Sequence, residues 1–169
     1  IANINTHGMN FNQGIWNSKQ GVVSINAINN DIGLWLQHAS QVQFGGANIS
    51  NSATSVQVEG GSSLTFTDNL TTDNNIAIND AMLNVANLSI SKGGLTLEGA
   101  KSQLDSNGAI TVAQDITINQ GSMYAGAITT QGNINISGAN SKLINDEERG
   151  NALNNAFIGH YDRKSGQYE

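Results

Sequence analysis

Apolar and polar residues alternate along most of the chain in short runs, and one run recurs. Its form is apolar-x-apolar-x-x-Gly/Ala, as in Ile116-Thr-Ile118-Asn-Gln-Gly121 and Ile134-Asn-Ile136-Ser-Gly-Ala139. Five earlier copies begin at Met9, Leu34, Val56, Ile76 and Leu95. Successive copies start 25, 22, 20, 19, 21 and 18 residues apart. Alternation with a period of two residues predicts that each copy is a short strand with one buried face.

A second apolar pair follows within most of the repeating units. Examples are Val42/Phe44, Leu64/Phe66, Leu83/Val85 and Ile110/Val112. The Gly, Asn, Asp and Ser residues between the pairs predict frequent turns. No segment before residue 145 keeps an apolar stripe of helical period for three turns. The pattern therefore predicts an all-β protein built from very short strands.

Two all-β architectures use short strands at this spacing, the antiparallel sandwich and the right-handed parallel β-helix. A sandwich gives no reason for one signature to repeat in register. In a β-helix each copy lies directly above the last, about 4.8 Å along the axis, so like residues stack on like. We predict a β-helix over residues 1–144, with about seven coils of about 20 residues. Ile76, Leu95, Ile116 and Ile134 should then form one interior column.

The first separation between copies is the longest, which predicts a loop between Ile15 and Ile32 that contains Trp16. Trp35 lies between two inward-facing positions, Leu34 and Leu36, so its side chain should project outward.

Residues 145–169 lose the repeat. Three acids at 146–148 precede Ala152, Leu153, Ala156 and Phe157, a pattern typical of an amphipathic helix with acids in its first turn. Such a helix would cap the open end of a solenoid. A C-terminal cap, a loop to further coils and a tail all stay open for this segment.

The amino-acid composition restricts the kinds of partner that the chain is expected to bind. The chain has 19 Gly, no Cys and a net charge of −6, with 5% aromatic and 12% charged residues. The acidic balance argues against nucleic acid, which attracts basic patches. Without Cys, disulfide and thiol chemistry is excluded, and no apolar run approaches the roughly 18 residues of a membrane helix. Because the chain opens on Ile1 in mid-pattern, we expect a fragment or a processed product.

Three stretches place Gly, Ser and Leu after a strand: Gly60-Gly-Ser-Ser-Leu64, Gly99-Ala-Lys-Ser-Gln-Leu104 and Gly138-Ala-Asn-Ser-Lys-Leu143. Together with the repeat over residues 9–144, they resemble the β-helical passenger regions of bacterial autotransporters and of two-partner-secreted filamentous-haemagglutinin-like adhesins. The resemblance implies export, and a location that is extracellular or on the bacterial outer-membrane surface. It also implies a role in attachment and virulence, without identifying a receptor.

Candidate chemistry is sparse. Glu59 and Glu98 lie two coils apart, about 9.6 Å by the strand spacing, at the edge of the range for an inverting glycosidase pair. His7, His38 and His160 are far apart and lack the spacing of metal ligands. We therefore expect no enzymatic activity, no cofactor and no metal.

We expect a non-catalytic structural or adhesive segment that attaches to host cells or to other cells. Its partners would be a host-cell receptor, a glycan or identical rods on neighbouring cells, without nucleic acid and without membrane insertion by this segment. The candidate contact residues are Trp16, Trp35, Tyr124, His160 and Tyr161. Packing under a loop or cap is the alternative for each.

The alternative function is that of a glycan-binding or glycan-degrading β-helix, of the tailspike or depolymerase type. That function needs a groove formed by long inserted loops. Only the region from Ile15 to Ile32 is long enough to supply one.

Overall fold

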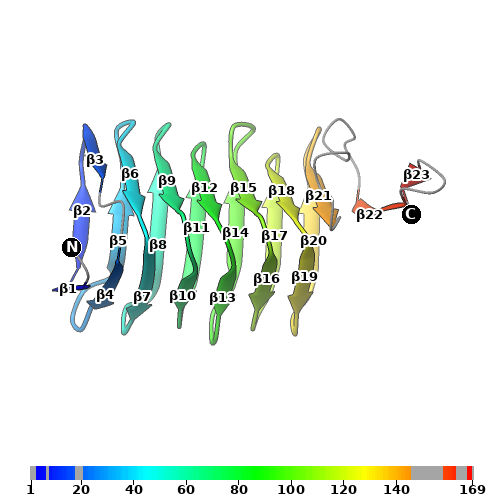
Figure 1. Ribbon diagram of the computed structural model, residues 1–169. Coiled ribbons are helices and arrows are strands. Elements are labelled where there is room, and N and C mark those ends of the chain that lie inside the picture. The colour runs from blue at the N-terminus through cyan, green and yellow to red at the C-terminus, as the bar shows by residue number, and fades with distance from the viewer. Residues whose placement is uncertain (1–2, 7, 18–20, 146–157, 163–166, 169) are drawn as a thin grey trace.

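The computed structural model describes residues 3–6, 8–17, 21–145, 158–162 and 167–168, with the side chains of residues 8–17 and 21–145. Over these ranges the chain consists of strands and turns and contains no helix. The strands gather into three long sheets around a shared interior. Figure 1 shows the coils side by side along a rod, with the N-terminus at one end and the C-terminus at the other.

Each coil contributes one strand to each sheet, in chain order. The first sheet consists of β1 (Asn3–Thr6), β4 (Val22–Asn26), β7 (Gly46–Ser50), β10 (Leu70–Thr72), β13 (Leu88–Ile90), β16 (Ala109–Val112) and β19 (Ala127–Thr130). The second sheet consists of β2 (Met9–Phe11), β5 (Ile32–Leu36), β8 (Thr54–Glu59), β11 (Asn75–Asn79), β14 (Leu95–Glu98), β17 (Ile116–Asn119) and β20 (Ile134–Ser137). The third sheet consists of β3 (Ile15–Asn17), β6 (Gln41–Phe44), β9 (Ser63–Phe66), β12 (Met82–Val85), β15 (Gln103–Ser106), β18 (Ser122–Ala125), β21 (Lys142–Asn145), β22 (Ile158–Asp162) and β23 (Gln167–Tyr168).

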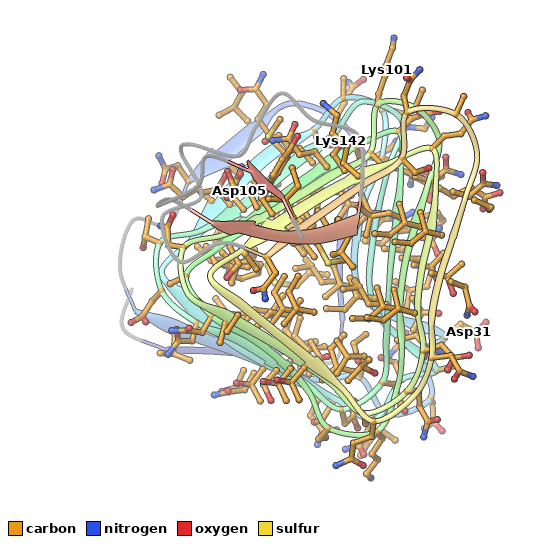
Figure 2. All side chains as sticks on the ribbon, turned by 90° about the vertical axis from the view of Figure 1, so that its right-hand side faces the viewer. Asp31, Lys101, Asp105 and Lys142 are labelled. Atoms are coloured by element: carbon orange, nitrogen blue, oxygen red, sulfur yellow. The ribbon has the colours of Figure 1, made fainter. Side chains whose placement is uncertain are left out.

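The strand pairs are parallel throughout the coils, and the antiparallel pair β22–β23 lies after them. The chain passes seven times through the first and second sheets and so makes about six full turns of about 21 residues. Figure 2, viewed along the rod, shows the three-sided cross-section that these turns trace. The predicted parallel β-helix is confirmed. Three strands form each coil, whereas the apolar pattern identified two.

The predicted interior column is also confirmed, because Ile76, Leu95, Ile116 and Ile134 are register partners on consecutive coils. The first three are at most 1% exposed, whereas Ile134 is 44% exposed because β20 is the last strand of its sheet. Burial of each such side chain stabilises the fold by about 1.5–3 kcal/mol. Because like residues stack on like, each coil contributes buried apolar side chains to the core.

The corner between the second and third sheets is where the predicted Gly/Ala position falls. Its backbone is left-handed, with φ values of +48° at Asp80 and +67° at Gln120. A Cβ added at Gly121, the residue after Gln120, would lie 3.1 Å from Leu97 Cβ. Small residues recur at this corner because the chain turns sharply against the coil below.

The prediction of a loop holding Trp16 is wrong. Trp16 lies in β3, in register with the buried Val42, and its ring centroid is 4.9 Å from that of Phe44. Phe44 stacks in turn on Phe66 at 5.4 Å. Trp16 thus belongs to an aromatic stack that packs on the core, with its own ring partly buried. The extra length of the first coil falls partly in the turn at residues 27–31, which is longer than the equivalent turn at residues 73–74.

The repeat ends at Asn145, the last residue of β21. The backbone of β22 continues the third sheet, with Leu143 in register with Ile158. The amphipathic helix predicted from residues 146–157 lies outside the described residues.

Candidate functional site

Trp35 lies on the outer face of the second sheet. Its strand neighbours Leu34 and Leu36 are fully buried, while the Trp35 side chain is partly exposed. The outward orientation predicted for this residue is confirmed. A large aromatic side chain on the outer surface of a rod made mostly of small polar residues is a candidate for contact with a binding partner.

Hydrogen bonds hold the Trp35 side chain in place. Its indole Nε1–H donates to Glu59 Oε2 on the next coil, at 2.9 Å. The amide of Gln57 donates to the same carboxylate oxygen. Glu59, which accepts the indole bond, and Gln57, which bonds to Glu59, both lie on strand β8. The indole is therefore held in place before a ligand binds, which lowers the entropic cost of binding.

An open groove of about 590 Å³ lies beside the indole, within the usual size range of small-molecule sites. This Trp35 groove is lined by Gly8, Met9, Asn10, Asn30, Asp31, Ile32 and Trp35. It lies where β2, the turn at 27–31 and β5 meet, so the enlarged turn of the first coil supplies one wall. Figure 2 shows Asp31 pointing away from the body of the rod.

The polar groups of the groove are held by its own framework. Asn10 Oδ1 accepts a hydrogen bond from Gln37 Nε2 at 3.3 Å. Asn30 Nδ2 donates to the carbonyl of Ile28 at 3.2 Å, and the carbonyl of Asp31 accepts from the Thr54 N–H at 2.9 Å. Asp31 is the only charged side chain among the lining residues that the structure describes. The groove thus combines an aromatic wall, two primary amides and one carboxylate.

A smaller hollow of about 260 Å³ lies further along the same face. Its lining includes Glu59, Asn79 and Glu98. Asn79 is in register with Glu59 on one side and with Glu98 on the other, so the carboxylates are two coils apart, as the repeat predicts. That separation is about 9.6 Å by the strand spacing.

The other predicted contact residues do not join Trp35. Trp16 is a partly buried residue of β3 whose ring packs against the core, and Tyr124, on β18, is 8% exposed with Asp105 and Ile144 as register neighbours. His160 and Tyr161 belong to β22, at the far end of the rod from the groove, and their side chains lie outside the described set.

Sequence reasoning missed Asn10, Asn30 and Asp31, and it did not identify Glu59 as a hydrogen-bond partner of Trp35. Two signals were available. Glu59 follows Trp35 by 24 residues, one coil plus two positions, which places it diagonally above the indole. The long first separation predicted extra residues near this place, although not in which turn.

Over the part of the chain that the structure describes, no group of three or more His, Asp or Glu side chains is arranged to hold a metal ion. A search of the same residues finds no helix long and apolar enough to cross a membrane. Comparison with known proteins gives no match to any family model, curated protein or solved structure.

Proposed function

We propose that this chain is a non-catalytic adhesive segment of a bacterial protein that is secreted or exposed at the cell surface. The observation that supports this function best is the Trp35 groove, an immobilised aromatic side chain on the outside of a stiff rod. The parallel β-helix is compatible with the passenger regions that the sequence resembles. In this proposal the rod holds the groove away from its point of attachment.

Rigidity suits such a role. The coils are joined by continuous ladders of backbone hydrogen bonds, and buried corner serines add further bonds between adjacent coils. Strand β5, which carries Trp35, pairs with β2 on one side and with β8 on the other, so neighbouring coils support the indole wall of the groove. A surface of this kind suits attachment to a receptor or glycan on another cell.

The test is adhesion of beads coated with the purified chain to cultured epithelial cells and to bacteria. Beads carrying the parent chain should bind, and beads carrying Trp35→Ala should bind markedly less. Thr117→Ala is the matched control, because Thr117 is a partly exposed residue of the same outer column four coils away. If parent beads and Trp35→Ala beads are retained equally, the Trp35 groove is not the site of attachment. No retention of the parent would count against adhesion itself.

A glycan-degrading function is the second candidate, favoured by the hollow that Glu59 and Glu98 share. Against it, Glu59 already accepts hydrogen bonds from Trp35 and Gln57. A reducing-sugar release assay on polysaccharides separates the two functions. Release that is lost in Glu59→Gln or Glu98→Gln would establish catalysis and overturn the adhesive proposal.

A further inference from the structure

We propose that the Trp35 groove binds an uncharged glycan, one sugar ring of which stacks on the Trp35 indole. This inference rests on the proposed adhesive function and names the chemical class of its ligand. It follows from three properties of the groove: its aromatic wall, the kinds of polar group around it, and its charge.

The aromatic wall comes first. A pyranose ring presents a flat face of C–H groups, and an indole offers a flat apolar surface of matching extent. Trp35 is held by its bond to Glu59, and the groove beside it extends to Met9 and Ile32. A sugar ring in this position exchanges water for apolar contact without having to order the protein.

The polar groups select hydroxyls. Each primary amide, at Asn10 and Asn30, carries both donors and an acceptor, and the Asp31 carboxylate carries acceptors. A sugar hydroxyl also donates and accepts, so it can pair with both kinds of group. An organic cation placed over the indole gains cation–π attraction. It has no partner for the amide donors, so the amides favour the sugar.

The charge selects against acidic glycans. Asp31 lines the groove, and the Glu59 carboxylate lies directly beyond the indole. The Lys residues whose side chains the structure describes, Lys92, Lys101 and Lys142, all follow β13 in the chain, several coils away. Uronic or sulfated sugars would bring like charges together.

The test uses Trp35 as its own reporter. The chain contains two Trp residues, so Trp16→Phe leaves Trp35 as the single indole and keeps a ring in the aromatic stack. This variant is titrated with maltoheptaose, cellohexaose and mannohexaose as neutral probes. Polygalacturonate oligomers and tetramethylammonium chloride serve as the acidic and cationic probes. We expect a saturable change in Trp35 emission with at least one neutral oligosaccharide and none with the other two probes.

The same titration is repeated after adding Asn10→Ala or Asp31→Ala, with Thr117→Ala as the control. Each groove substitution should weaken binding by roughly tenfold, equivalent to about 1.4 kcal/mol, and the control should leave it unchanged. Far-UV circular dichroism should show that all variants keep the parent's β structure. A response to the acidic or cationic probe alone, silence with every neutral probe, or undiminished affinity in both groove variants would overturn the inference.

Failure of this inference is distinguishable from failure of the proposed function. If coated beads attach to cells through Trp35 but no neutral sugar binds, adhesion stands and the ligand class is wrong. If a neutral sugar binds but the beads do not attach, the ligand class stands and the adhesive role is wrong.

Discussion

At the scale of single residues, buried corner serines explain why a Ser follows the Gly in the stretches 99–104 and 138–143. Ser102 is 2% exposed, and its hydroxyl accepts the Asp80 N–H from the coil below at 2.7 Å. The same hydroxyl donates to the carbonyl of Glu98 in its own coil at 2.5 Å. Ser141 repeats this arrangement with Gln120 N–H. A serine here links two coils without leaving a buried polar group unpaired.

We expect Ser102→Ala to lower the free energy of unfolding by about 1–2 kcal/mol, because two buried hydrogen bonds are lost. Urea unfolding followed by circular dichroism measures the change. Ser89→Ala, at an exposed position of β13, should stay within about 0.5 kcal/mol of the parent. If Ser102→Ala unfolds at the same urea concentration as Ser89→Ala, the corner bonds contribute nothing to stability.

The indole N–H of Trp35 can be tested apart from its ring. Trp35→Phe keeps an aromatic surface but removes the donor that bonds Glu59 at 2.9 Å. Affinity for a neutral oligosaccharide that binds the parent should fall roughly two- to tenfold, the value of one hydrogen bond. Trp35→Ala should abolish the binding, and isothermal titration calorimetry measures both. Equal affinity in Trp35→Phe and the parent would mean that the bond to Glu59 does not orient the ring.

The two tryptophans also show where sequence reasoning succeeds. Trp35 is flanked by two apolar residues, so the period of two assigns it outward without ambiguity. Trp16 is flanked by Ile15 and Asn17, and the pattern alone does not decide which of Ile15 and Trp16 points inward. The structure packs the larger ring, partly buried, into the aromatic stack and leaves Ile15 79% exposed.

At the scale of strands, alternation was informative where inward positions are aliphatic. Ile116, Ile118 and their register partners predicted the second sheet coil by coil. The first sheet was harder to predict because its inward positions vary, as in β10, where Leu70 and the polar Thr72 both face the core. The buried threonine interrupts the apolar signal of β10. In β4, β13 and β16 both inward positions are apolar, as Val23/Ile25, Leu88/Ile90 and Ile110/Val112 show. Counting one second apolar pair in each repeat therefore did not separate the strands of the first sheet from those of the third.

Adjacent residues of β14 offer a direct test of this alternation. Leu97 is fully buried and Thr96 is exposed. Leu97→Ala should cost about 2–5 kcal/mol, since it removes methyl groups from the interior column and leaves a cavity. Thr96→Ala should cost less than about 0.5 kcal/mol. Thermal and urea unfolding measure both, and equal costs at the two positions would contradict the strand orientation.

At the scale of the whole molecule, each coil contacts mainly the coils next to it. Stability in such a solenoid is approximately a sum over coils and the interfaces between them. The repeat therefore predicted the architecture of the rod. It did not predict the Trp35 groove, which depends on how a turn from one coil meets a strand from another. Turn length varies along this chain without a periodic signal, so the position of the groove required the structure.

The modular rod predicts that a complete coil can be removed in register. Deleting residues 95–115 joins Gly94 to Ile116, so that β17, β18 and β19 take the places of β14, β15 and β16. We expect this variant to fold, to shorten by about 4.8 Å in small-angle scattering, and to keep the affinity of the distant Trp35 groove for any sugar that the parent binds. Deleting residues 95–105 removes only half a coil and sets strands against turns, so that variant should lose the β signal in circular dichroism. If both deletions fold equally well, or neither folds, the coils are not interchangeable units and the groove cannot be treated as a separate module of the rod.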